Sequence, residues 1–96
     1  MDTTTIIRIL HDLEGKALQD YRVKIKAVFG SLVRGEVKAG SDIDVLVEFE
    51  EGANLLHFVG LSQFLEDSLH VPVDVVPMDA LRNELREEVL REAVYL

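Results

Sequence analysis

The 96-residue sequence has no cysteine, no tryptophan and only two prolines. The absence of cysteine excludes disulfide bridges and thiolate metal sites, and it is typical of an intracellular protein. No apolar run approaches the roughly 18 residues that cross a membrane, and the first residues lack the basic start and apolar core of an export signal. We therefore expect a cytoplasmic protein that has no membrane partner.

Basic residues are scarce as well. The sequence has 10 Lys and Arg against 18 Asp and Glu, which gives a formal net charge of −8. Direct binding to nucleic acid needs clustered Lys and Arg, and the basic residues here form no such run, so a polymerase-like function is disfavoured. Apolar residues make up 48% of the sequence, which suffices for one core but not for two. We expect residues 1–96 to form a single domain.

Two short motifs stand beside β-prone segments. Gly30 has no Cβ and can admit a phosphate close to the backbone, while Ser31 adds a hydroxyl donor. Asp42 and Asp44 form a D-x-D pair that a strand would direct to one face, where a hydrated Mg²⁺ can take an oxygen from each. A third carboxylate, Asp74, interrupts a Val-rich segment. Each motif alone is usually a turn or a polar strand end, but Asp is uncommon in strands, so the combination favours a metal–nucleotide site.

Hydrophobic periodicity predicts the elements that carry these motifs. Strands are expected at residues 23–29, 43–50 and 71–76, and helices at 4–21, at 31–33 and from 54 to 69. A final helix is expected to begin at an Asp79 cap and to bury the stripe Leu81, Leu85, Val89 and Ala93. Odd-numbered strand residues are apolar and should lie under helices, whereas the even-numbered face should carry the carboxylates. The pattern predicts an α/β fold with a three-stranded mixed sheet, in order 1-2-3, and helices mainly on one face.

These motifs resemble those of the minimal nucleotidyltransferase (MNT) domains of the DNA polymerase beta superfamily. The resemblance covers G-S-L-V-R-G-E at residues 30–36, S-D-I-D at 41–44, and a Leu-, Arg- and Glu-rich segment at 81–93. It implies the minimal nucleotidyltransferase fold and the role of antitoxin in a toxin–antitoxin pair. The partner would be a HEPN ribonuclease toxin, and the reaction would transfer AMP from ATP to a tyrosine of that toxin. One departure is Leu32, since many relatives have a basic residue there.

The resulting assignments are specific. Asp42 and Asp44 are expected to hold the Mg²⁺ that carries the ATP triphosphate, and together with Asp74 to share a second Mg²⁺ that activates the acceptor hydroxyl. Asp74 is also a candidate general base. The candidate nucleotide-binding residues are Gly30, Ser31, Arg34 and Ser41.

The sequence leaves alternative roles open for Arg34 and for the whole chain. Arg34 could equally form a surface salt bridge with Glu36 in place of a phosphate contact. The chain could neutralise its partner by binding alone, or it could be a transferase for a small molecule or nucleic acid, although size and charge disfavour the latter. The sequence leaves self-association open.

Overall fold

The structure is a computed structural model that describes residues 2–35 and 42–96. Within these residues the elements are α1 (Thr3–Tyr21), β1 (Val23–Phe29), β2 (Ile43–Phe49), α2 (Leu55–Leu69), β3 (Val73–Pro77), the 3₁₀ helix η1 (Met78–Ala80), α3 (Asn83–Glu92) and β4 (Val94–Tyr95). The strands form one mixed sheet in the order β3-β2-β1-β4. The expected α/β fold is confirmed, but the expected number of strands is wrong, because the sheet has four strands and not three. The two-residue β4, which pairs antiparallel with β1, is too short to show a strand pattern in the sequence.

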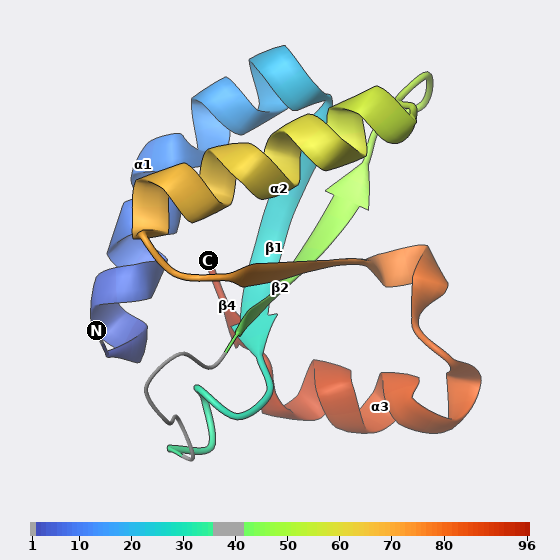
Figure 1. The fold of residues 1–96 in the computed structure, drawn as a ribbon. Helices are drawn as coiled ribbons and strands as arrows, with labels where there is room; N and C mark the ends of the chain where they lie inside the picture. The colour runs from blue at the N-terminus through green and yellow to red at the C-terminus, as the bar shows by residue number, and fades with distance from the viewer. Residues whose placement is uncertain (1, 36–41) are drawn as a thin grey trace.

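The main core lies between the sheet and two helices. Figure 1 shows α1 and α2 side by side over the sheet, with α3 apart from them, beside the end of β1. Ile6 and Leu10 of α1 and Leu61 and Leu65 of α2 are at most 1% exposed and form one cluster with the strand residues beneath them. No helix in the described part of the chain is long and apolar enough to cross a membrane.

Side chains fix the beginnings of these two helices. Asp2 caps α1 by accepting a hydrogen bond from the Thr5 amide at 2.8 Å. At α2, Asn54 and His57 form a reciprocal capping box, in which the His57 amide donates to Asn54 Oδ1 and the Asn54 amide donates to His57 Nδ1. The start of α2 is therefore rigidly defined.

A β-bulge in β1 changes which residues face the core. Ile25 pairs with Val47, but the register then shifts so that Ala27 pairs with Leu46 and Phe29 pairs with Asp44. A bulge inserts one extra residue and reverses the alternation that follows it. Val28, not Ala27, consequently joins the main core cluster. The expected odd-numbered apolar face is confirmed for the start of β1 and for β2 and β3, but it is wrong for Ala27 and Phe29.

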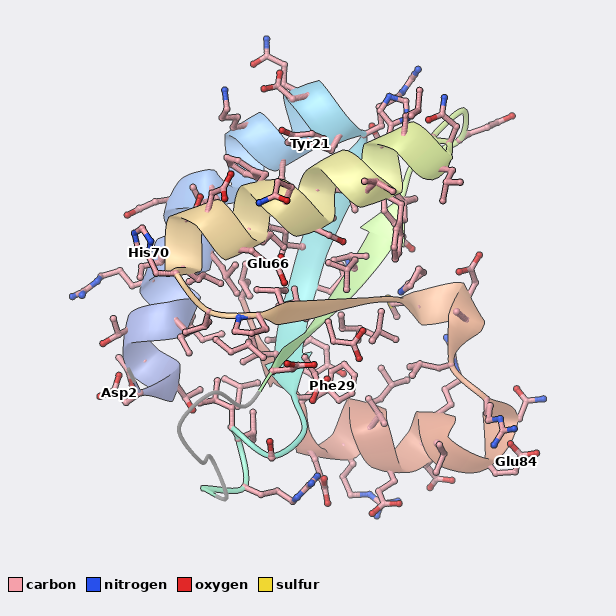
Figure 2. The ribbon with its side chains drawn as sticks, viewed as in Figure 1. Asp2, Tyr21, Phe29, Glu66, His70 and Glu84 are labelled. Atoms are coloured by element: carbon pink, nitrogen blue, oxygen red, sulfur yellow. The ribbon has the colours of Figure 1, made fainter. Side chains whose placement is uncertain are left out.

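A side chain of α2 fixes the entry into β3. Figure 2 shows Glu66 on the side of α2 that faces the sheet, and its Oε2 accepts a hydrogen bond from the Val73 amide at 2.9 Å. The strand begins at this residue, two positions later than expected. Glu66 thus holds the backbone next to Asp74, although nothing in the sequence spacing links the two residues.

The expected final helix differs most from the structure. Asp79 lies in η1 and does not cap a helix, because Met78–Ala80 form a separate 3₁₀ turn after Pro77. The helix α3 begins only at Asn83 and has no side-chain cap. No residue of α3 is buried, and Leu85 is 48% exposed, so the predicted apolar stripe does not form a core contact.

Candidate active site

The structure brings two of the predicted carboxylates together. Strands β2 and β3 run parallel, and Asp44 and Asp74 are direct partners in their register. Residues opposite each other in a sheet direct their side chains to the same face, so both carboxylates lie on the face away from α1 and α2. Asp42 immediately precedes β2 and is exposed. The expectation that Asp44 and Asp74 share one face is confirmed.

Gly30 lies directly against this carboxylate pair. Its φ is +83°, in the left-handed region that disfavours side chains. A Cβ at this position would collide with the carboxylate of Asp44, and Asp44 Cγ would lie only 3.1 Å from it. Two independent constraints therefore require glycine here: the backbone conformation and the space that Asp44 occupies. The glycine brings the turn after β1 into contact with the acidic pair.

The segment after Gly30 is a turn and not the predicted short helix. The Arg34 amide donates to the Gly30 carbonyl at 3.2 Å, and the Gly35 amide donates to the Leu32 carbonyl at 3.2 Å. Leu32 is only 7% exposed and belongs to the main core cluster. A basic residue could not occupy that position without burying its charge, which gives the departure at Leu32 a structural reason. The buried leucine anchors the turn and leaves Ser31 beside Gly30.

Arg34 connects this turn to α3. Its guanidinium lies 3.6 Å from the Glu92 carboxylate, and both side chains are partly exposed. Its positive charge also acts on Asp44, where it lowers the pKa. Glu92 was not predicted from the sequence, because 58 positions separate it from Arg34 and no local motif links them. The alternative partner, Glu36, and the nucleotide-binding candidate Ser41 lie outside the described residues.

The electrostatics of the pair are unfavourable without a cation. Burial, followed by the charge of Asp74, a hydrogen bond with Asp74 and the charge of Asp42, raises the pKa of Asp44 from 3.8 to about 6. The opposing effect of Arg34 is the smallest of these contributions. Asp44 therefore passes from its neutral to its ionised form near pH 6, and such a raised pKa is typical of carboxylates that share a site.

The donor set suits a hard divalent cation. Carboxylate oxygens are the ligands that Mg²⁺ prefers, and it commonly binds through one or two of them while keeping water and phosphate oxygens as its other ligands. Asp44 and Asp74 supply two, and Asp42 is close enough to affect the pKa of Asp44. Within the described residues, no three His, Cys, Asp or Glu side chains form a ready-made metal cage. The residues therefore fit a cation that arrives with additional ligands, such as a nucleotide triphosphate.

Comparison with known sequences agrees with this geometry. The model of the nucleotidyltransferase domain family matches residues 8–96. The chain is 46% identical over 76 residues to the protein adenylyltransferase MntA of Thermococcus cleftensis, and the match covers 79% of this chain and 77% of the relative. It is also 36% identical over 98 residues to a Methanocaldococcus jannaschii protein, MJ0128, to which the same activity is provisionally assigned, and that match covers both chains completely.

Solved structures show the same fold. A structure described provisionally as a minimal nucleotidyltransferase superposes with a TM-score of 0.81 at 42% identity, and the match covers 100% of this chain and 97% of that one. A toxin–antitoxin crystal structure with AMP-PNP superposes with a TM-score of 0.66 at 26% identity. That match covers 83% of this chain and 66% of the other.

Substituting the glycine at the site should separate backbone strain from a specific effect on Asp44. Gly30→Ala and Gly35→Ala both place a Cβ at positive φ, but only the first meets Asp44, since no atom of the described residues would lie within 4 Å of a Cβ at Gly35. We expect strain at positive φ to cost each variant roughly 1–2 kcal/mol of unfolding free energy. Gly30→Ala should lose more than Gly35→Ala, because the Asp44 carboxylate must also move. Only Gly30→Ala should also weaken Mg-ATP binding at least about ten-fold, roughly 1.4 kcal/mol, in calorimetry. Equal nucleotide affinity in the two variants would contradict the assignment of Gly30.

The raised pKa of Asp44 predicts a pH-dependent stability in chelator-treated protein. Because the folded-state pKa is about 6 and the unfolded value 3.8, Asp44 contributes stability below pH 4 that is lost as the pH rises through 6. The full shift corresponds to about 3 kcal/mol, which solvent screening of this half-exposed carboxyl reduces to the order of 1 kcal/mol. Asp44→Asn should therefore stabilise the metal-free protein in urea unfolding at pH 8 but not at pH 4. A stabilisation of the same size at both pH values would show that the negative charge of Asp44 is not its cause.

Proposed function

The chain belongs to the nucleotidyltransferase domain family, and from this membership we propose that it transfers AMP from ATP to a tyrosine hydroxyl of a partner protein, a HEPN ribonuclease toxin. The observation that carries the proposal is the pairing of Asp44 with Asp74 beside Gly30 on one face of the sheet. The relative named protein adenylyltransferase MntA supports AMP transfer to a protein. The structural neighbour solved as a toxin–antitoxin with AMP-PNP supports both the nucleotide and the toxin partner.

The residues divide between nucleotide and acceptor. Gly30 and Ser31 approach the terminal phosphates of ATP, and Arg34 offsets charge on the phosphate groups. Asp42, Asp44 and Asp74 would hold two Mg²⁺ ions, which supply charge neutralisation and lower the pKa of the acceptor hydroxyl. The partly exposed Arg34 is already placed by Glu92 near Asp44.

The reaction is an in-line substitution at the α-phosphorus of ATP. The tyrosine oxygen forms a bond to this phosphorus while the bond to the oxygen that bridges to the β-phosphate breaks, and pyrophosphate leaves with that electron pair. The hydroxyl proton passes to Asp74, which is exposed and so accessible to an acceptor on another protein. Asp44 is the more buried of the two carboxylates and remains on the nucleotide side.

A second candidate function is inhibition of the partner by binding alone. The observation that keeps it in view is the set of exposed apolar side chains at the start of α2, Leu55, Leu56 and Val59, which offer a partner a surface that needs no catalysis. In that case the carboxylates would be inherited structure, and their charge would not affect inhibition.

Co-expression with the HEPN-type partner distinguishes the two functions. We expect the wild-type chain to leave the partner heavier by one or more AMP units on a tyrosine in intact-mass and peptide spectra. An Asp42→Asn, Asp44→Asn double variant should leave it unmodified, because the charge that binds Mg²⁺ is lost while the side-chain shape is kept.

The matched control is an Asp12→Asn, Asp20→Asn double variant, which removes the same two charges from exposed positions on α1. It should modify the partner as the wild type does. Both double variants are first tested for folding by circular dichroism and for partner binding. A partner that stays unmodified yet is fully inhibited by the wild type and by the Asp42→Asn, Asp44→Asn variant would favour the binding function.

A further inference from the structure

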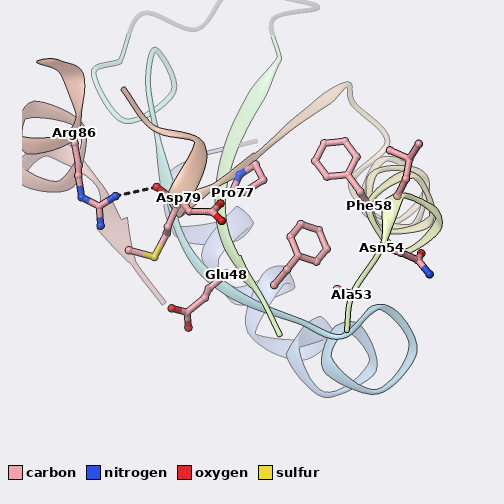
Figure 3. A pocket seen from close by; sticks show the side chains of 10 residues that line it. Glu48, Ala53, Asn54, Phe58, Pro77, Asp79 and Arg86 are labelled. Carbon is pink, nitrogen blue, oxygen red and sulfur yellow. Dashed lines mark hydrogen bonds between the residues drawn. The ribbon is translucent and has the colours of Figure 1, made fainter. Parts of the chain in front are cut away.

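A groove lies at the opposite end of β2 from the carboxylate pair. Its volume is about 680 Å³, and Figure 3 shows it between the start of α2 on one side and η1 and α3 on the other. Its floor is apolar and is formed mainly by Phe49, Phe58, Pro77 and Met78. Glu48, at its edge, is four residues beyond Asp44 in the same strand, so the groove lies roughly 13 Å from the candidate active site. We call it the α2–η1 groove.

Exposed apolar side chains extend the groove onto the surface of α2. Leu55 lines the groove and is 74% exposed, and its neighbours Leu56 and Val59 are 80% and 56% exposed. Large apolar side chains gathered around a hollow are characteristic of a surface that binds another protein. The capping box of Asn54 and His57 fixes this first turn of α2, so the surface is formed before a partner arrives.

Charge around the groove selects its occupant. Glu48 and Asp79 line it, and Glu50 and Glu51 follow in the segment that leads to α2. The one cationic side chain among the lining residues, Arg86, donates a hydrogen bond to the Met78 carbonyl at 2.9 Å. An occupant that buries apolar side chains here is therefore favoured if it also carries positive charge.

We propose that the α2–η1 groove docks a helical segment of the partner protein that presents apolar side chains flanked by Lys or Arg. The inference rests on the proposed function, since the partner is the protein whose tyrosine is modified. Glu48 and Asp44 lie on the same face of β2, because even-numbered residues of this strand share a face. A partner held in the groove would have its acceptor tyrosine kept close to the site, which raises the effective concentration of the hydroxyl.

Other occupants fit the groove less well. A second copy of the chain would bring another net charge of −8 against an acidic rim. A nucleotide would place its phosphates near the carboxylates of Glu48 and Asp79. Arg86, the one cationic side chain among the lining residues, already donates a hydrogen bond to the Met78 carbonyl. A partner helix with apolar and basic side chains satisfies both the floor and the rim.

The test uses a fluorescent helical peptide of leucine and lysine, and the same peptide with glutamate in place of lysine, without ATP. Leu55→Lys should weaken binding of the lysine peptide at least roughly ten-fold in fluorescence anisotropy, because it places a cation in the groove. Leu18→Lys makes the same charge change at a 39% exposed leucine of α1 and should alter binding less than about two-fold. The glutamate peptide should not bind. Val59→Lys, on the exposed apolar surface of α2 beside the groove, provides a second variant if Leu55→Lys does not fold.

Several results would overturn the proposal. Equal weakening by Leu55→Lys and Leu18→Lys would mean that the peptide responds only to net charge. Displacement of the peptide by Mg-ATP would assign the groove to the nucleotide. A self-associated wild type that Leu55→Lys converts to monomer in sedimentation would assign it to a second copy. These measurements involve no AMP transfer. A failure of the proposed reaction would therefore leave the peptide result unchanged, and a failure of the peptide to bind would leave the test of AMP transfer unchanged.

Discussion

The arrangement of this protein depends on a pair of like charges, Asp44 and Asp74, held side by side by the register of two parallel strands. Burial, together with this pairing, raises the pKa of Asp44 to about 6, so the folded chain keeps an unfavourable contact that an ordinary core would avoid. Such strain at an otherwise well-packed sheet is characteristic of a functional site. A divalent cation that arrives with phosphate would convert the repulsion into binding energy.

The surrounding structure holds this contact in place. The bulge in β1 brings Phe29 opposite Asp44, and Gly30 then leaves room for the carboxylate. Leu32 anchors the next turn in the core, while Glu66 fixes the backbone before Asp74 from the helix side. The helices α1 and α2 therefore stabilise one face of the sheet, and the acidic pair lies on the other face. The α2–η1 groove, where we propose that the partner docks, lies at the far end of β2.

The sequence predicted the features that depend on local patterns. Alternating apolar residues located the strands and placed Asp44 and Asp74 on one face, because register follows from that alternation. Features that depend on distant contacts were not predicted: the bulge before Ala27, the two-residue β4, and the pairing of Arg34 with Glu92. The predicted start of the final helix was wrong. Pro77 is followed by a separate 3₁₀ turn that contains Asp79, and in the sequence an aspartate at this position looks the same as a helix cap. The roles of the site residues themselves remain predictions.

The most direct measurement of the central claim is a crystal structure of the protein with Mn²⁺ and an ATP analogue whose α–β bridging oxygen is replaced by methylene. Manganese prefers the same oxygen ligands as magnesium and can be located by its anomalous scattering. The account predicts an anomalous peak bound by carboxylate oxygens of both Asp44 and Asp74, with the triphosphate beside Gly30 and Ser31. A nucleotide bound elsewhere, or manganese that contacts neither carboxylate, would contradict it.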